Sequence, residues 1–464
     1  MSGKTNWMIG LALLAALAGF LFGTGGSSDA TAAAAQSSSR THVGVASCGG
    51  TTCHGRQEAD GEIVRQDEIM RWQEPSSATG AHSRAYSVLT QARSQHIARE
   101  LGIGNPASAA MCLGCHADYV PATQRGPRFQ LSDGVGCEAC HGGAGGRSTG
   151  WLASHYAVGN SHSANVSRGL YPLDNPRARA SRCLDCHFGG TGEGQFVNHR
   201  IMAAGHPRIV FELDLFSTLQ QHHDEDADYA RRKGRTNHVQ LWAIGQATAL
   251  DRSLTLFTNQ RLGTEGIFPE FYFFDCHTCH RRIYDNPNAR PTGVANPGRP
   301  IPNGFPSYQD ENMIMLWAAA RVIAPGLAER FDRDSRGFHA ALAQGRSAGV
   351  EAAGRLRESA RALANAFASA SFSRQQSFAI IDAVSSGAIA PRYTDYEGSV
   401  QAVMATDTLL NALVSQGAVS EGSVGGIRSD INAAYAAVSE PNAYRPAEFR
   451  AALGRATSAI ARLQ

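Results

Sequence analysis

Ten cysteines fall into five close pairs along the chain, and a histidine directly follows the second cysteine of every pair. No cysteine is left over, which argues against a free catalytic thiol and against a framework of long-range disulfides. Ten cysteines in 464 residues are also too few for a disulfide scaffold. The pairing therefore constrains this chain more than any other feature, because each of five short segments must present two thiols and one imidazole together.

Four of the five pairs are separated by two residues, and the first pair is separated by four. Cys-x-x-Cys-His is the signature of covalently attached c-type haem, in which the two thiols bond to the porphyrin and the histidine faces the iron. A loop of four residues can still form the same three bonds. The predicted attachment cysteines are Cys48, Cys53, Cys112, Cys115, Cys137, Cys140, Cys183, Cys186, Cys276 and Cys279. The predicted proximal iron ligands are His54, His116, His141, His187 and His280.

Two other uses of paired cysteines fit this pattern poorly. A structural zinc ion needs two such pairs, so five pairs do not divide evenly, and zinc does not explain a histidine after every second cysteine. A redox dithiol of the thioredoxin kind occurs once, in a βαβ setting. We therefore predict five covalently attached c-type haems, with their iron, as the cofactors.

The second axial ligand of each iron decides whether the iron is closed or can bind a substrate. Twelve of the 17 histidines remain after the five proximal ligands, which permits complete bis-histidine ligation. We rank as distal ligands first His82, His155, His199 and His206, and second His42 and His162. His222, His223 and His238 lie among charged residues and are interpreted as members of a solvated segment. His277 lies inside a motif and is a candidate for a neighbouring haem, and His96 is interpreted as structural.

The N-terminal part of the chain resembles the multihaem cytochrome c-554 family. The resemblance is close over about residues 44–160, and the motif Cys183–His187 extends it to about residue 190. Its features are the first motif, Trp72, the string from Ala81 to Tyr86, Cys112–His116, the string Gly-Val-Gly-Cys-Glu-Ala-Cys-His-Gly ending at Gly142, and the string from Trp151 to His155.

This resemblance implies a mainly helical domain in which haems stack in close pairs. It further implies that His155 closes the first haem, that of His54, and that His82 closes the third, that of His141. The second haem, that of His116, would be open. The chain departs from the family in the two extra residues of its first motif and in its added fifth haem.

Composition divides the chain into segments. Residues 1–22 hold an apolar run of 16 residues and are predicted to be a signal peptide or an N-terminal membrane anchor, followed by a flexible tether over 23–41. A pentahaem domain is predicted over 42–284, a Pro-rich linker over 285–306 and an α-helical domain over 307–464. We therefore expect an exported protein that is periplasmic, membrane-anchored or extracellular in a bacterium.

We predict a mainly α fold with little regular sheet, in which an all-α bundle follows the haem domain. A core helix is expected over 241–262. The aromatic run 268–274 fits a strand by pattern, but we expect it to pack against porphyrin. Beyond it, helices are expected at 310–331, 336–371, 374–386, 395–416, 425–438 and 447–463. Capping boxes at Ser373-x-x-Gln376 and Thr394-x-x-Glu397, Pro446 in a first turn and Gly417 as a C-terminal cap support these helices.

These features favour an electron-carrying cytochrome whose partners are redox proteins that donate and accept electrons. The alternatives are a haem oxidoreductase that acts on nitrite, hydroxylamine or nitric oxide at one open haem, and a subunit of an extracellular conducting filament. No catalytic residue is predicted, and an electron carrier is favoured over an enzyme. The formal net charge of +2 gives no support for a nucleic-acid partner. The helical domain could be a scaffold, a docking surface or a homo-oligomer interface.

Overall fold

A computed structural model gives the structure of the chain. It describes residues 40–58, 65–146, 148–157, 159–223, 225–264, 268–280, 299–301, 305–389 and 395–464. Helices dominate these residues, which confirms the predicted mainly α fold. The described residues contain no named strand, and their only β pairs are the isolated bridges between His42 and Arg125 and between Phe274 and Tyr308.

The first part of the chain folds into short helices joined by long irregular segments. Its 3-10 helices are η1 (Val45–Ser47), η2 (Ser87–Thr90), η3 (Ala122–Gln124) and η4 (Leu131–Asp133). Its α-helices are α3 (Glu68–Trp72), α4 (Ala92–Leu101), α5 (Ala110–His116), α6 (Cys137–His141), α7 (Gly150–His155) and α8 (His162–Ser167). Few of these helices reach the length at which a helix is stable by itself.

The middle of the chain is built around one long helix, α13 (His238–Thr258). It follows α9 (Pro176–Leu184), the π-helical turn η5 (Asp185–Gly189), α10 (His199–Ala203), α11 (Leu213–Leu219) and α12 (Ala227–Lys233). It precedes η6 (Phe271–Phe273) and α14 (Cys276–Cys279). The helix α13 is apolar on nearly all sides, because it packs against α9 and α11 on one side and against C-terminal helices on the other.

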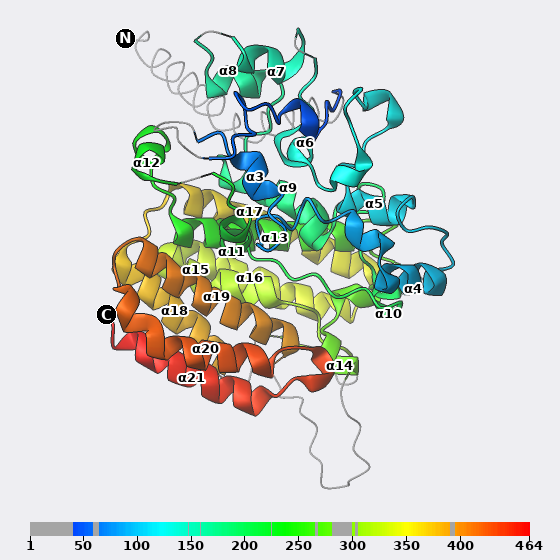
Figure 1. Cartoon of the computed structure of the whole chain (residues 1–464). Coiled ribbons are helices and arrows are strands. Elements are labelled where there is room, and N and C mark those ends of the chain that lie inside the picture. The colour runs from blue at the N-terminus through cyan, green and yellow to red at the C-terminus, as the bar shows by residue number, and fades with distance from the viewer. Residues whose placement is uncertain are drawn as a thin grey trace, which may run out of the picture.

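The C-terminal part is a stack of longer helices, coloured yellow to red in Figure 1. They are α15 (Glu311–Ile323), α16 (Pro325–Leu342), α17 (Arg346–Ser369), α18 (Arg374–Ile389), α19 (Tyr396–Ser415), α20 (Gly425–Ala437) and α21 (Pro446–Ala461), with η8 (Glu421–Val424) and η9 (Pro441–Ala443) between them. One continuous core of buried apolar side chains runs from Ala180 to Ile460. Residues on both sides of the Pro-rich segment thus share a core through α13.

The sequence predicted most of the C-terminal helices within a few residues. Two predictions were wrong. The expected helix over 310–331 ends at Ile323, and Pro325 opens a new helix because proline fits the first helical turn. The expected helix over 336–371 is divided between the end of α16 and α17, with Gly345 at positive φ between them. The Ser373–Gln376 capping box is formed in both directions. The cap of α19 is Asp395, whose side chain accepts the amide of Gly398, rather than the predicted Thr394.

The aromatic run 268–274 forms a 3-10 turn instead of a strand. Phe273 is fully buried, and its ring contacts Phe257 and Tyr308 within the protein core. Phe271 in the same turn is 49% exposed and its ring lies 5.3 Å from that of His199. Phe273 therefore packs inside the protein, and Phe271 is the residue of this turn that remains free for the expected packing against porphyrin.

The predicted signal or anchor, almost all of the tether and most of the Pro-rich linker lie outside the described residues. No helix in the described part of the chain is long and apolar enough to cross a membrane. The division of the chain at 285–306 stays a prediction.

Candidate haem sites

Each predicted attachment motif lies on a short helix or a tight turn. The second, third and fifth motifs coincide with α5, α6 and α14, and the fourth runs from the end of α9 into η5. Positions three and four apart share one face of a helix, so the first cysteine, the second cysteine and the histidine point the same way. We number the sites one to five in the chain order of these motifs.

The stretched first motif closes its extra residues into a tight turn. The amide of Cys53 donates to the carbonyl of Gly50 at 2.8 Å, and the amide of His54 donates to the carbonyl of Cys48 at 3.2 Å. The second hydrogen bond brings the histidine back beside the first cysteine. The two additional residues therefore bulge outward without separating the three groups that would hold a haem.

A second histidine faces the proximal histidine at every one of the five motifs. The ring centres are separated by 6.0 Å at the first site, 6.3 Å at the second, third and fifth, and 5.9 Å at the fourth. The pairs, in site order, are His54–His155, His116–His206, His141–His222, His187–His82 and His280–His199.

These separations fit one metal ion between each pair of rings. An imidazole nitrogen lies about 2 Å from a bound metal ion, so two imidazoles on opposite sides of one ion have ring centres about 6 Å apart. The rings of the adjacent residues His222 and His223 are closer, with centres 4.3 Å apart. The angles between the paired rings vary from 17° to 86°, which is compatible with this arrangement because each ring can rotate about its bond to the metal.

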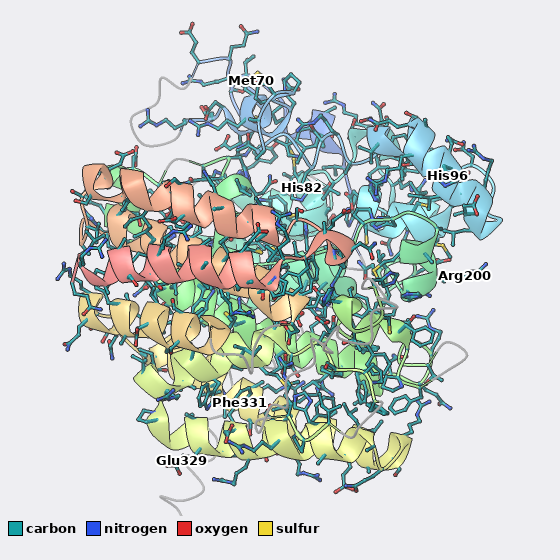
Figure 2. All side chains as sticks on the ribbon, turned by 90° about the horizontal axis from the view of Figure 1, so that it is seen from below. Met70, His82, His96, Arg200, Glu329 and Phe331 are labelled. Carbon is teal, nitrogen blue, oxygen red and sulfur yellow. The ribbon has the colours of Figure 1, made fainter. Side chains whose placement is uncertain are left out.

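Four of the five facing histidines are those ranked first from the sequence: His82, His155, His199 and His206. The geometry differs from the resemblance in two ways. His82, marked in Figure 2, lies against the ring of His187 and not against that of His141. The second site, expected to be open, has the ring of His206 opposite His116.

The residue that sequence reasoning missed is His222, which faces His141. The charged residues that follow it suggested a solvated segment. His222 is nevertheless largely buried, and its Nδ1 lies 3.0 Å from the carbonyl oxygen of Gln220 in the turn after α11. An adjacent pair of histidines inside the haem region was the one signal in the sequence that could have indicated this role.

The two histidines ranked second, His42 and His162, each contact a carboxylate instead of a motif histidine. His42 is buried, with its Nδ1 at 2.8 Å from Asp118. The Nε2 of His162 lies 3.1 Å from Asp174. His277, a candidate for a neighbouring haem, has its Nδ1 at 3.1 Å from the carbonyl oxygen of Pro441 and so joins α14 to the C-terminal helices.

Burial keeps most of the paired histidines in their neutral form. It lowers the pKa of His141 to about 3 and the pKa values of His187 and His222 to about 4, mainly because the charged imidazole would lose its hydration. Neutral imidazole is the form that binds metals. His54 is the exception among these residues, since a hydrogen bond to Glu68 raises its pKa.

Contacts between cysteines place the first four motifs next to one another. Cys48 in the first motif interacts with Cys137 in the third, which lowers the pKa of the Cys48 thiol. The thiol of Cys115 in the second motif donates to the carbonyl of Cys186 in the fourth at 4.0 Å, and the thiol of Cys186 donates to the carbonyl of Gly114 at 3.7 Å. Cys140 of the third motif interacts electrostatically with Cys183 of the fourth. The motifs therefore form a connected series in the spatial order one, three, four, two.

The segment from His206 to Phe211 connects this series to the fifth motif. His206 faces the second proximal histidine, and the ring of Phe211 lies 6.0 Å from His187 of the fourth site. Between them, Arg208 places Nη1 at 3.5 Å from Sγ of Cys276. The segment from His206 to Phe211 therefore contacts residues of the second, fourth and fifth sites.

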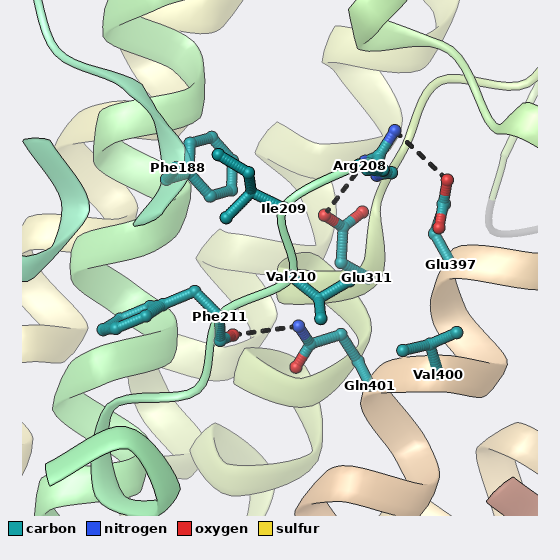
Figure 3. Close-up of a pocket in the computed structure, with 9 residues that line it drawn as sticks. All are labelled: Phe188, Arg208, Ile209, Val210, Phe211, Glu311, Glu397, Val400 and Gln401. Carbon is teal, nitrogen blue, oxygen red and sulfur yellow. Dashed lines mark hydrogen bonds and ion pairs between the residues drawn. The ribbon is translucent and has the colours of Figure 1, made fainter. Parts of the chain in front are cut away.

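The C-terminal helices build the base of the fifth site. Asp275 caps α14 by accepting the amide of Thr278 at 3.1 Å, and its other oxygen accepts the amide of Glu397, at the start of α19, at 3.2 Å. Arg208 pairs with Glu397 at 3.1 Å and lies 3.9 Å from Glu311, around the small pocket drawn in Figure 3. The fifth motif is therefore held by residues more than a hundred positions later in the chain.

Comparison with known proteins identifies the N-terminal sites. The sequence model of the family described as Cytochrome c554 and c-prime matches residues 47–142, which include all of the first three motifs. No curated protein and no solved structure matches the chain. The match supports a cytochrome c domain with covalently attached c-type haem over these residues.

Proposed function

We propose that the chain is an exported pentahaem cytochrome c that relays electrons between redox proteins. When bound, haem supplies reversible one-electron chemistry. The ten paired cysteines would attach five haems, and each of the five histidine pairs would hold one iron from both sides. The observation that carries the proposal is that all five motif histidines are faced by a second imidazole at 5.9–6.3 Å.

The same observation favours a carrier over the enzyme considered above. A small substrate needs a free position on the iron, and a second imidazole would fill that position. The contacts between cysteines of different motifs support close packing of the cofactors, since the vinyl side of each porphyrin would lie at its cysteines. Proteins of the matched family typically act outside the cytoplasm, which supports export.

The neighbouring histidines His222 and His223 allow a matched test of the third site. Replacement of His222 by Ala should convert one haem of five from low spin to high spin, because one iron loses its second imidazole. Replacement of His223 by Ala should leave all five low spin. Haem content measured as the pyridine haemochrome, together with electron paramagnetic resonance, gives both quantities.

Two results would contradict the proposal. One is a purified protein with fewer than five haems per chain, and the other is a substantial high-spin signal in the unsubstituted protein that shifts when nitrite or hydroxylamine is added. The replacement of His155 by Ala extends the test to the first site, where His162→Ala is the control on the following helix.

A further inference from the structure

We propose that Glu68 is a positioning residue that orients His54 and lowers the reduction potential of the first haem. This inference rests on the proposed function, because it assumes an iron between His54 and His155. Glu68 is the first residue of α3, and its Oε2 lies 3.0 Å from Nδ1 of His54. The contact fixes Nδ1 as the nitrogen that donates to the carboxylate, so Nε2 is left to face the ring of His155.

The backbone holds this carboxylate in place independently of the contact itself. The amide of Ile69 donates to the carbonyl of His54 at 3.0 Å, and the amide of Arg56 donates to the carbonyl of Gln66 at 2.8 Å. Both hydrogen bonds tie the start of α3 to the residues that follow the first motif. The side chain of Glu68 is only 14% exposed, so water competes weakly for its oxygens.

The other oxygen of Glu68 is also engaged. Its Oε1 lies 3.4 Å from Nδ1 of His223, the residue after the histidine that faces the third motif. A carboxylate between two imidazoles has little rotational freedom. It therefore presents a fixed negative charge to the proximal ligand of the first site.

A carboxylate at this position has a defined effect on a metal site. When the ring nitrogen that does not bind the metal donates a hydrogen bond to a carboxylate, the imidazole becomes a stronger electron donor to the metal. Stronger donation and a nearby negative charge both stabilise ferric iron more than ferrous iron. The reduction potential consequently falls, since hydrogen bonding around the ligands is one of the protein's means of setting it.

The first site differs in this respect from the others. At the second site the Nδ1 atoms of His116 and His206 lie 2.9 Å and 2.8 Å from the carbonyl oxygens of Ala85 and Pro207. At the third site His222 has the carbonyl of Gln220 as its partner. Among the described residues, His54 is the one member of the five pairs with a carboxylate hydrogen bonded to its ring. The charge of Glu68 also acts on His141 and His222 of the third site, but without a hydrogen bond to either ring, so the first iron would experience the largest effect.

The test is a redox titration of the pentahaem protein by protein-film voltammetry, comparing Glu68→Gln with the unsubstituted chain. Glutamine keeps the size of the side chain and removes its charge. The midpoint of the first haem should move furthest toward a more positive potential, and all five haems should stay low spin. Glu68→Asp, which restores the charge, should return that midpoint toward its original value.

Glu58→Gln is the control, because it removes an exposed carboxylate only four residues after His54. None of the five midpoints should move in this variant. His155→Met changes the distal ligand of the first iron alone, so it identifies the midpoint of the first haem. The midpoint that shifts most in Glu68→Gln must be the same one. A Glu68→Gln protein with five unchanged midpoints, or with its largest shift at a different haem, would overturn the assignment of Glu68 to the first haem.

The unsubstituted protein provides a second test in case Glu68→Gln does not fold. His155→Met and His206→Met identify the midpoints of the first and second haems, and the first should be the more negative of the two. A first midpoint equal to or above the second would reject the inference. The count of five low-spin haems in the unsubstituted protein decides the proposed function separately, whichever way the midpoints fall.

Discussion

The residues before α9 and those after it build their interiors in different ways. Before α9, the apolar clusters are small: one consists of Leu89, Leu113 and Ala117, and Leu101 belongs to another that is completed by two residues from α10 and its end. From Ala180 onward a single core extends to Ile460, and the largest fully buried side chains, such as Trp242 and Phe367, belong to it. A region with so little core of its own needs another source of buried apolar surface, which the porphyrins of its three motifs would supply.

The two kinds of interior meet at α13. This helix packs on α9, which carries the first cysteine of the fourth motif, and on α17 of the C-terminal stack. The fifth motif depends in the same way on α19 through Asp275 and Glu397. The comparison indicates that the C-terminal helices can fold around their own side chains, while the first three motifs cannot.

The largest expected effect is therefore that of leaving out haem. A chain expressed without haem attachment should lose all protease protection before about residue 175, because its small clusters cannot offset the entropy of ordering the chain. A resistant fragment that extends from about α9 to the C-terminus should remain. Limited trypsin digestion with mass spectrometry measures both, and a uniformly resistant or a uniformly digested chain would remove the distinction between the regions.

Replacing a large side chain in the continuous core by a smaller one should reduce the free energy of unfolding without changing the haem sites. Phe367, at the end of α17, is fully buried, and its replacement by Ala should cost about 3–5 kcal/mol. The absorption spectrum of the haems should be unchanged in the folded protein. Leu219→Ala is the control, since this side chain is 45% exposed and its loss should cost little. Urea denaturation followed by circular dichroism gives the free energies of unfolding.

The buried charges under the fifth motif predict a pH dependence. Burial raises the pKa of Glu311 from 4.5 to about 7, although Arg208 opposes the shift. The folded protein thus keeps a proton that the unfolded chain loses above pH 4.5, so the stability from this group falls as the pH rises from about 4.5 to about 7. The full change is about 3 kcal/mol at most.

Glu311→Gln carries no such proton and should show a shallower loss of stability over that pH range. The difference between the two proteins is the measured quantity, because it isolates Glu311 together with the groups whose pKa it shifts, such as Asp310. Parallel curves for the variant and the unsubstituted chain would show that Glu311 does not titrate in this window.

The smallest expected effect concerns the cap of α18. Ser373 and Gln376 satisfy each other's backbone amides, and Ser373→Ala removes one of these hydrogen bonds. The loss should be about 1 kcal/mol, measured as the shift in the urea midpoint. A comparable loss in Ser423→Ala, which changes a serine at the end of η8 outside any α-helix cap, would argue against a specific capping role.

Local sequence signals predicted the C-terminal helices well because their causes are local. The capping box at Ser373, Pro446 in the first turn of α21 and the left-handed Gly417 after α19 act within a few residues of themselves. The division at Pro325 was missed because the apolar pattern continues across it. Apolar residues spaced three and four apart indicate a helix, but they do not show where one helix ends and the next begins.

The ligand pairs were harder to predict because each joins two distant segments. The resemblance named the partner of His155, the first motif, where His155 faces His54 in the structure. His199 and His206 were ranked from their place in the haem region, which did not indicate the motif that each would face. His82 faces the fourth motif, whereas the resemblance assigned it to the third. His222 faces the third motif, whereas the charge pattern indicated a solvated segment.

The sequence by itself determined where haem would be attached, because two thioether bonds and one iron ligand must come from a single short segment with fixed spacing. It also determined that the chain is mainly helical. Only the tertiary structure decided which second histidine faces each iron, and that the fifth motif rests on α19. Those choices depend on how α9, α13 and the segment His206–Phe211 pack together, and packing between distant segments leaves no fixed spacing in the sequence.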